Sequence, residues 1–517
     1  MISKVRIQNL KSLRDTGFID IRPITILAGE NSSGKSTFLR MFPLLTQSVT
    51  KKLRGPISWF DDTLVDFGDY ATAKCSNADK DENIVFSFKL ELSLDQLYLP
   101  YHVRSRISPI ITDLPELYVS VHYSEDTKGT FVKRVDIISD LFEIKIIQPE
   151  RGGSLNIEAD SEHINTPADF KWIQGSDFGM LPMFYGLKTH DSYYYINDEI
   201  LKQILSPVSN LCDKRFRKFS KLFPLYYKWC IDKETYLWNV KKFSDIKSLK
   251  KEIENWTIDT PEFCSLYRTI LVHKMLEIWP YINSELTKFF MNCDYTAPLR
   301  AQAQRYYRNQ GLLTSNIDSH GYNLSEFIDS LTKTQRESYR KFVKRLLGIE
   351  VLTKNITGHQ TINLKENDCE FNLTDVGFGY SQMLPIITKI WSLQEGRRFS
   401  SLAYYRQDQV TSLIEQPELH LHPSLQGKLA DAFIRAIDVD NSSYNSQFII
   451  ETHSSTIINR IGRRIAEGKL SSEKVNVVLF EKKSLQGDTI VKCTQFDSKG
   501  RLKQWPIGFF EPEDEDF

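Results

Sequence analysis

The spacing of hydrophobic and polar residues changes along the chain and predicts different elements in different parts. Up to about residue 48, short apolar runs alternate with turns, and the run Ile24–Ala28 predicts a buried strand that enters a glycine-rich loop. Apolar and polar residues alternate at 84–92, 116–122 and 142–147. This alternation predicts strands of an antiparallel sheet with one face in water.

The glycine-rich loop matches the phosphate-binding pattern G-x-x-x-x-G-K-[ST] without a mismatch. An apolar strand precedes the loop and an apolar-faced helix follows it, so its backbone N–H groups and the helix N-terminus would cradle phosphates. Lys35 would reach the β- and γ-phosphates of ATP, and Ser36 would hold Mg²⁺. The predicted nucleotide contacts are Gly29, Glu30, Asn31, Ser32, Ser33, Gly34, Lys35, Ser36 and Thr37.

The pattern from about residue 160 to 350 is helical and rich in lysine and aromatic residues, without an internal repeat. After about residue 355 the alternation of strands and helices returns. We therefore predict an α/β fold, in which a nucleotide-binding head is interrupted by a helical insertion. The expected divisions are 1–155 for the N-terminal half of the head, 156–350 for the mainly helical insertion and 351–517 for the C-terminal half.

The composition limits the expected number of domains, the location of the protein and the partners it can bind. The 517 residues are enough for two or three domains, and no apolar run approaches the ~18 residues of a membrane span. The N-terminus has no secretory signal, and the seven cysteines form no C-x-x-C pair, so we expect a cytoplasmic protein without a membrane segment. With 66 basic and 66 acidic residues the net charge is zero, so any contact with nucleic acid must be local.

Three features of the final third indicate the class of P-loop protein. Residues 375–382 place small residues ahead of an apolar helix, as a signature motif that touches a γ-phosphate across a dimer requires. An apolar strand ends at Glu415 and is followed by a proline and a second acid. A later strand leads to His453, which is placed to sense a γ-phosphate. The order of these motifs favours an ATPase head over a kinase or GTPase.

This order resembles the ABC-type P-loop ATPase heads of the SMC, RecF and OLD relatives, which combine a mixed central sheet with an antiparallel β subdomain. Further segments resemble a bacterial subfamily that includes PtuA, the ATPase subunit of Septu anti-phage defence systems, some of which are attached to retrons. The segments that carry this resemblance are 7–13, 295–300 with Arg305 and Tyr306, 376–385, 415–423 and 500–510.

The resemblance implies roles for individual residues. Glu415 would be the Walker B partner of Mg²⁺ beside Ser36, and His453 would be the switch histidine. Two heads would sandwich two nucleotides, so the resemblance implies a homodimer or a higher homo-oligomer. The remaining implied nucleotide contacts are Lys11 and, acting from the partner copy, the signature residues Gly379, Ser381 and Gln382.

The chain departs from this pattern at Gln416, where such heads usually carry a catalytic glutamate. A glutamine amide can orient the attacking water but cannot accept its proton, and general-base help is worth about 10²-fold to 10⁴-fold. We therefore predict slow hydrolysis and a long-lived ATP-bound state. Glu418 is a candidate substitute base, although it could instead lie at the dimer contact.

Other polar clusters admit two interpretations each. His420 and His422 fit either a metal site or, more simply, a structural role at a dimer interface. Basic residues from Lys214 to Lys251 and around 336–345 fit either a nucleic-acid surface or a solvated helical face. The acidic segment 511–517 fits a solvated end or a docking strip for a basic partner.

The function expected from these features is an ATP-binding sensor and scaffold in an anti-phage complex. The resemblance implies a separately encoded effector nuclease of the HNH type, and a reverse transcriptase with its RNA/DNA product where a retron is attached. We find no nuclease constellation in the sequence, so the chain alone is not predicted to cleave DNA or RNA. The alternative is a RecF-like DNA-binding ATPase of repair or recombination.

Overall fold

The computed structural model divides into two compact units, which are described separately. The first unit contains Met1–Val5, Lys51–Ile57 and Asn83–Thr287, and the second contains Arg6–Thr50, Ser58–Glu82 and Lys288–Phe517. The residues that the structure describes are 1–92, 114, 116–164, 170–174, 179–185, 188–190, 193–195, 225–226, 228–243, 247–308, 311, 313–395, 409–438, 445–482 and 487–503.

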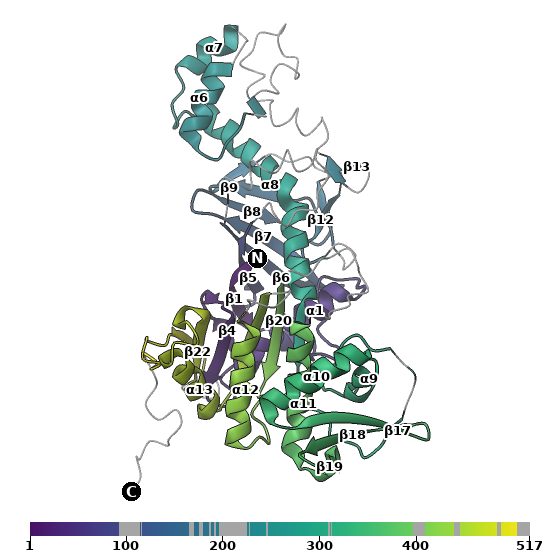
Figure 1. Ribbon diagram of the computed structural model, residues 1–517. Helices are drawn as coiled ribbons and strands as arrows, with labels where there is room; N and C mark the ends of the chain where they lie inside the picture. The colour runs from purple at the N-terminus through teal and green to yellow at the C-terminus, as the bar shows by residue number, and fades with distance from the viewer. Residues whose placement is uncertain are drawn as a thin grey trace. The chain divides into compact units, whose positions relative to one another are not determined.

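A six-stranded mixed sheet forms the centre of the second unit (Figure 1). Its order is β15-β20-β21-β4-β22-β23, and every neighbouring pair is parallel except β22 with β23. The strand that enters the glycine loop is β4, and β21 lies between it and β20. The strands are β4 (Ile24–Gly29), β15 (Cys293–Thr296), β20 (Gln409–Glu415), β21 (Asn445–Glu451), β22 (Val475–Glu481) and β23 (Ile490–Thr494).

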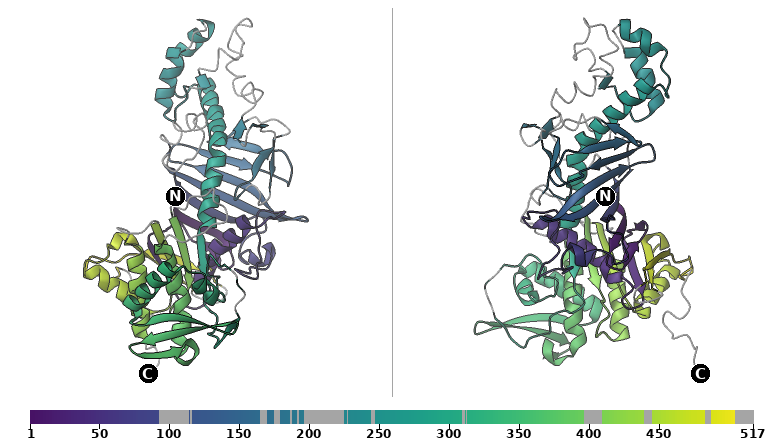
Figure 2. Two further views of the ribbon diagram at one scale, coloured as in Figure 1. Left: turned by 45° about the vertical axis from the view of Figure 1, so that its right-hand side comes forward. Right: turned by 180° about the vertical axis from the view of Figure 1, so that it is seen from behind.

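Helices cover both faces of this sheet, as its almost entirely buried strands require. Ile26, Ile414 and Ile450 belong to a core shared with α11 (Phe378–Gln394), α12 (Pro423–Ala436) and α13 (Ser455–Ala466). The helix α1 (Lys35–Thr50) packs against β4, β20 and β21 and is visible from behind in Figure 2. The predicted α/β fold, with its buried strand before the glycine loop, is confirmed.

The second unit also holds smaller elements around the central sheet. A four-stranded antiparallel sheet has the order β16-β18-β17, with β19 paired to β18. Within the described residues, no helix has the length and apolar character that crossing a membrane requires. The further elements are the end of β1 (Ile2–Leu10), β2 (Leu13–Asp15), β3 (Ile19–Asp20), α2 (Tyr70–Ala73), β16 (Tyr307–Arg308), α9 (Leu324–Asp329), α10 (Lys333–Leu347), β17 (Glu350–Ile356), β18 (His359–Glu366), β19 (Cys369–Asn372) and the short 3₁₀ helices Leu373–Asp375 and Ser472–Lys474.

An antiparallel sheet forms much of the first unit, in the order β10-β9-β8-β7-β6-β5. Buried and partly exposed residues alternate along β6 and β8, so one face is buried and the other is partly open to water. The three strands predicted from alternation are confirmed as β5, β6 and β8. The sheet strands are β5 (Ile84–Glu91), β6 (Glu116–Asp126), β7 (Gly129–Ile138), β8 (Glu143–Ile147), β9 (Asn156–Ala159) and β10 (Glu162–Ile164).

Short strands and long helices share the rest of the first unit, where a mainly helical segment 156–350 was expected. Strands β9 to β14 lie before residue 196, and residues from Lys288 onward belong to the second unit. Strands of three or four residues are too short for a period of two to stand out in the sequence. The remaining elements are β11 (Lys171–Ile173), β12 (Met183–Tyr185), β13 (Lys188–His190), β14 (Tyr193–Tyr195), α6 (Lys233–Phe243), α7 (Lys247–Glu254) and α8 (Pro261–Met291).

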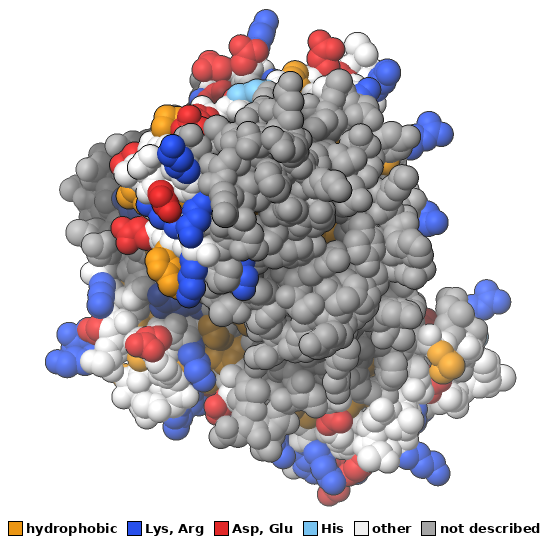
Figure 3. All heavy atoms as spheres, turned by 90° about the horizontal axis from the view of Figure 1, so that it is seen from above, with side chains coloured by type: hydrophobic (Ala, Val, Ile, Leu, Met, Phe, Trp, Pro, Cys, Tyr) orange, Lys and Arg blue, Asp and Glu red, His pale blue; other side chains and the backbone are white. Residues whose placement is uncertain are grey.

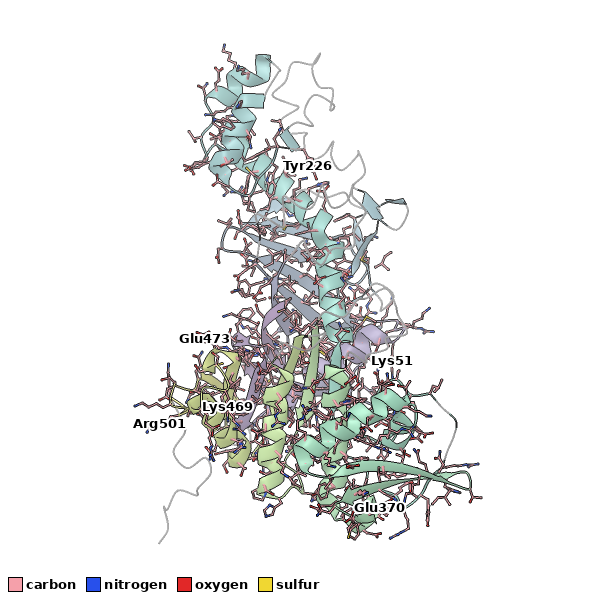
Figure 4. The ribbon with its side chains drawn as sticks, viewed as in Figure 1. Lys51, Tyr226, Glu370, Lys469, Glu473 and Arg501 are labelled. Atoms are coloured by element: carbon pink, nitrogen blue, oxygen red, sulfur yellow. The ribbon has the colours of Figure 1, made fainter. Side chains whose placement is uncertain are left out.

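The helical part of the first unit is held by buried aromatic and polar contacts. The Tyr226 hydroxyl, labelled in Figure 4, lies 2.7 Å from Nδ1 of His273 on α8. Burial lowers the pKa of His273 well below its usual value, and the nearby Lys274 lowers it further. The imidazole is therefore neutral at physiological pH and acts as a buried hydrogen-bonding group.

A buried ion-pair cluster joins α12 to α13 and gives a stability prediction. Burial raises the pKa of Asp431, but hydrogen bonds from Arg464 and Arg460 outweigh it and lower the pKa to about 2. This contribution to stability is complete above the unfolded pKa and is lost as the pH falls through about 2. We expect Asp431→Asn to lower the free energy of unfolding at pH 7 by about 3 kcal/mol, measured by urea denaturation.

The difference between wild type and Asp431→Asn should shrink as the pH falls below about 4, because the wild-type carboxylate is then protonated in the unfolded state. Glu473→Gln provides the control, since Glu473 is exposed on the turn that precedes β22 and is labelled in Figure 4. A loss of the same size in both variants, or one independent of pH, would contradict this account.

Candidate nucleotide-binding site

The glycine loop between β4 and α1 adopts a backbone that only glycine tolerates at two places. Gly29 has φ +153°, and a Cβ there would lie 2.2 Å from the carbonyl oxygen of Phe480. Gly34 has φ +97°, and a Cβ there would lie 2.8 Å from the Leu13 side chain. Glu30, Asn31 and Ser32 are exposed at the top of the loop, whereas Ser33 is buried. The loop is therefore a tight phosphate-binding turn of the expected kind.

Lys35 lies folded back over this loop. Its amine donates to the carbonyl oxygen of Gly29 at 3.0 Å and also to that of Glu30. The side chain is 2% exposed, and burial lowers its pKa. The amine thus occupies the place where loop N–H groups and a helix N-terminus would meet phosphate oxygens. Thr37 follows in the first turn of α1 and is partly buried.

Two buried carboxylates stand at the ends of neighbouring strands and face α1. Glu415 ends β20, Glu451 ends β21, and the two residues are paired in the parallel ladder. The Ser36 hydroxyl donates to Oε1 of Glu451 at 2.7 Å. One helical turn later, Arg40 donates to both oxygens of Glu415 at 2.7 and 2.8 Å. The serine of the P-loop therefore contacts Glu451, whereas Glu415, the predicted Walker B acid, is held by Arg40.

The environment of the two carboxylates differs. The Tyr295 hydroxyl is a third donor to Glu415, at 2.8 Å from Oε1. Oε2 of Glu451 is buried and has no hydrogen-bond partner among the described residues. Burial, followed by the nearby charge of Glu415, raises the pKa of Glu451 to about 7. Glu451 is thus a buried carboxyl group with one oxygen to which no described residue donates.

Gln416 begins the turn after β20 in a constrained backbone conformation. Its φ is +41°, which is uncommon for a residue other than glycine. Its N–H donates to the carbonyl oxygen of Glu451 at 2.9 Å, and its own carbonyl accepts from the Leu419 N–H at 3.2 Å. Among the described residues, none forms a hydrogen bond with its side-chain amide. The amide is therefore unengaged while its backbone is fixed.

Glu418 and His453 meet on the other side of this turn. Glu418 accepts from the Thr452 hydroxyl and from the His453 N–H, each at 2.7 Å. Burial raises the pKa of Glu418 and lowers that of His453, to which the charge of Lys35 also contributes. Both oxygens of Glu418 are engaged within the chain, which favours a structural role for it over that of a substitute base.

The signature segment packs against the same turn through the start of α11. Gly377, with φ +89°, precedes the helix, and a Cβ on Gly379 would lie 3.3 Å from the carbonyl oxygen of His420. The Ser381 hydroxyl donates to the Phe378 carbonyl at 2.7 Å, and Gln382 donates to the Arg300 carbonyl at 3.2 Å. Both side chains are thus turned inward, so the exposed part of this segment is its glycine-rich beginning.

Comparison with known proteins places the chain in a family. The family model of the AAA ATPase domain matches residues 1–458, which is most of the sequence. The chain belongs to the AAA ATPase domain family. No curated protein matches it. The properties of this family that concern the glycine loop between β4 and α1 are ATP binding and ATP hydrolysis.

Solved structures that match this chain include heads of SMC proteins, at low identity and low TM-score. The SMC head bound to the C-winged helix domain of ScpA has a TM-score of 0.36 and 11% identity, with 96% of this chain and 98% of that chain covered. The SMC head with an extended coiled coil, bound to the C-terminal domain of ScpA derived from Pyrococcus furiosus, has a TM-score of 0.35, 11% identity and 96% coverage of both chains. The SMC head domain from Thermotoga maritima has a TM-score of 0.34 and 8% identity, with 95% and 98% covered.

Most of the predicted site residues of this ATPase lie together in the second unit. The glycine loop, Glu415, Glu418 and His453 surround the ends of β4, β20 and β21. Lys11 lies apart from them: its N–H donates to the Ala73 carbonyl, and its amine lies 3.4 Å from the Phe67 carbonyl oxygen. The neighbouring Ser12 does approach the loop, at 2.9 Å from a Cβ built on Gly34.

Sequence reasoning missed three groups that complete the site. They are Glu451, the pair Arg40 and Tyr295 that holds Glu415, and Arg300. The Arg300 guanidinium lies 3.4 Å from the carbonyl oxygen of Glu415 and 3.3 Å from that of Gln416. Burial lowers the pKa of Arg300 to about 10. An acid at the end of the strand that leads to His453 was a usable signal for Glu451. Arg300 and Tyr295 lie in the segment 295–300 that carries the resemblance but were given no role, and Arg40 carried no signal.

The two histidines near Glu418 have structural roles. The His422 side chain accepts from the Ser424 N–H and caps α12, and the His420 ring packs on Phe378 with centroids 5.1 Å apart. Among the residues that the structure describes, no three His, Cys, Asp or Glu side chains gather as a metal site. His422 thus caps a helix, and His420 packs on an aromatic ring.

Proposed function

We propose that the chain binds ATP with Mg²⁺ and hydrolyses it slowly, so that the ATP-bound state is long-lived. The observation that carries this proposal is Gln416, which stands directly after β20 with a fixed backbone and an unengaged amide. This amide would orient the attacking water but cannot take its proton. Slow hydrolysis would therefore set how long the protein stays in its ATP-bound state.

The residues around the glycine loop fit the Mg²⁺ that accompanies ATP. The buried Oε2 of Glu451 accepts no hydrogen bond from the described part of the chain, and the Ser36 hydroxyl and the Glu415 carboxylate lie beside it. Hydroxyl and carboxylate oxygens are the ligands that Mg²⁺ prefers. When bound, the ion would neutralise phosphate oxygens and orient the γ-phosphate. His453, neutral and near Lys35, would sense that phosphate.

The proposal includes a homodimer or a higher homo-oligomer that closes on ATP. The start of α11 would face the nucleotide of the partner copy through Gly377 to Gly379. Phe378 and Leu299 support an interface here, because their side chains are 44% and 70% exposed beside the turn that follows β20. In this assembly Ser381 and Gln382 would support the helix start from within.

The finer proposal is a cytoplasmic sensor and scaffold of an anti-phage complex, which controls a separately encoded HNH-type nuclease. The support for it is the resemblance of 295–300, 376–385 and 415–423 to Septu ATPase subunits. Where a retron is attached, its reverse transcriptase and RNA/DNA product would be further partners. Slow ATP hydrolysis suits this role, since the assembly would change state only when ATP is consumed.

The RecF-like alternative rests on local basic surfaces. Lys242 lies 4.3 Å from the ring centre of Trp238, which is 57% exposed on α6, a mixture that grips phosphates and stacks bases. The expected residues Lys214, Arg215, Arg217 and Lys218 lie outside the described residues, as does the acidic segment 511–517.

In the second basic segment, around residues 336–345, the charges favour a solvated helical face over a nucleic-acid surface. On α10, Lys341 pairs with Glu337, and at its end Lys344 pairs with Glu350. Figure 3 views the molecule from above Figure 1, and on that face basic and acidic side chains of the described residues are also intermingled. We therefore keep the sensor as the leading proposal and the DNA-binding ATPase as the alternative.

The assembly can be tested by size-exclusion chromatography with light scattering. We expect ATP with Mg²⁺ to shift the chain to a mass of at least two copies, and the dimer to persist after free ATP is removed, because hydrolysis is slow. ADP provides the control and should leave the smaller species. A mass that is the same with ATP, with ADP and without nucleotide would contradict the dimer.

Purification from the native operon distinguishes the two finer functions. A copurified HNH nuclease supports the sensor, and a reverse transcriptase with its nucleic acid adds the retron. Strong stimulation of ATP hydrolysis by DNA, measured on the chain alone and without such partners, would favour the RecF-like ATPase.

A further inference from the structure

The two carboxylates at the ends of β20 and β21 are equivalent in position but not in contacts. Glu415 and Glu451 form a register pair, so their side chains leave the sheet on the same face. Ser36 and Arg40 stand one helical turn apart on α1, opposite this face. The helix therefore presents a hydroxyl to one carboxylate and a guanidinium to the other.

The hydrogen-bonding capacity of Glu415 is largely occupied within the protein. Arg40 donates to both of its oxygens, and Tyr295 adds a second bond to Oε1. The Glu415 side chain is only 2% exposed, and a bidentate arginine in such a setting is both strong and geometrically specific. A metal that binds Glu415 directly would have to compete with Arg40 and Tyr295 for oxygens that already accept three hydrogen bonds.

Glu451 has the opposite character. Ser36 donates to Oε1, no residue that the structure describes donates to Oε2, and Glu451 is 1% exposed. The nearest lysine does not supply the missing partner, because the Lys35 amine donates to the Gly29 and Glu30 carbonyls. Moreover, β21 pairs directly with β4, whereas β20 is one strand further from the glycine loop.

We propose that Glu451, with Ser36, is the carboxylate that takes the Mg²⁺ of bound ATP, and that Arg40 is a positioning residue that keeps Glu415 in an ion pair beside the metal. This inference rests on the proposed ATP binding and deepens it. The metal-binding carboxylate is then Glu451 at the end of β21, and not Glu415 at the end of β20, which Gln416 follows. The charge of Glu415 then acts on the metal from a distance.

The test compares Glu451→Gln with Glu415→Gln in the full chain, using fluorescent ATP titrations and electron paramagnetic resonance of bound Mn²⁺. We expect Glu451→Gln to weaken Mn²⁺ binding to the ATP complex by about 10-fold to 100-fold, as the loss of a ligand or its supporting group typically does. ATP binding in EDTA should remain, because the phosphate cradle is unchanged. Glu415→Gln should weaken Mn²⁺ binding by a smaller factor than Glu451→Gln, because Glu415 acts on the metal only through its charge.

Since Glu415→Gln strands Arg40 and could impair folding, the double variant Arg40→Met with Glu415→Gln removes both charges together. It should bind ATP in EDTA and lose less Mn²⁺ affinity than Glu451→Gln. An equal loss in Glu451→Gln and Glu415→Gln, or a larger loss in the latter, would overturn the assignment. If the wild type binds no ATP in either buffer, the proposed function itself fails, which is a different result.

Discussion

Replacing Gln416 with glutamate is expected to raise the steady-state rate of ATP hydrolysis by about 10²-fold to 10⁴-fold. The residue follows β20 directly, and its backbone is held by Glu451, Leu419 and Arg300, so a carboxylate would start from the same position as the amide. The substitution preserves the size of the side chain and replaces a neutral amide with a carboxylate that can accept a proton. Phosphate release measured at saturating ATP and Mg²⁺ checks this prediction.

Glu418→Gln is the matched control for this experiment. Glu418 uses both oxygens to accept from Thr452 and His453, and an amide offers a single acceptor atom in their place. We expect this variant to perturb the turn without the gain in rate. If Gln416→Glu leaves the rate unchanged and Glu418→Gln abolishes it, Glu418 is the base and the slow-site account is wrong.

Lys35→Ala is expected to weaken ATP binding by at least about 100-fold, which corresponds to about 2.7 kcal/mol. The amine lies over the loop with Gly29 and Glu30 as partners, and it would exchange these carbonyls for phosphate oxygens. Alanine removes the charge and also leaves a gap in a buried position. Fluorescent ATP titration in the presence of Mg²⁺ measures the loss.

Lys74→Ala provides a lysine control in the same unit. The Lys74 amine also donates to two backbone carbonyls, those of Asp79 and Lys80, but Lys74 is only partly buried and lies far along the chain from the loop. ATP affinity should therefore remain at the wild-type value. An equal effect in both variants would show that the loss reflects general destabilisation and not the phosphate site.

Local signals in the sequence were sufficient for much of the head. The apolar run before Gly29 forms β4, and the segment that starts at Lys35 forms α1. Both could be predicted because the glycine and lysine residues that a phosphate loop requires are close together in the sequence. Alternation also identified β5, β6 and β8, where one face is buried over five or more residues. These elements are determined by short-range patterns.

The contacts of the site could not be predicted in the same way. Ser36 meets Glu451 because β21 pairs with β4, a consequence of strand order and not of sequence spacing. Likewise, Arg40 and Tyr295 reach Glu415 from two distant segments. The short strands of the first unit could not be predicted either. A strand such as β9 is stabilised by its pairing with β8 and β10, and its four residues carry no strong pattern of their own.

The central claim is that this ATPase holds its nucleotide intact for long periods, and a single-turnover experiment tests it most directly. Labelled ATP is bound to an excess of the wild-type chain with Mg²⁺, and the fraction converted to ADP is followed over time. The account predicts conversion at least about 10²-fold slower in the wild type than in Gln416→Glu. Equal rates of conversion of bound ATP in the two proteins would contradict it.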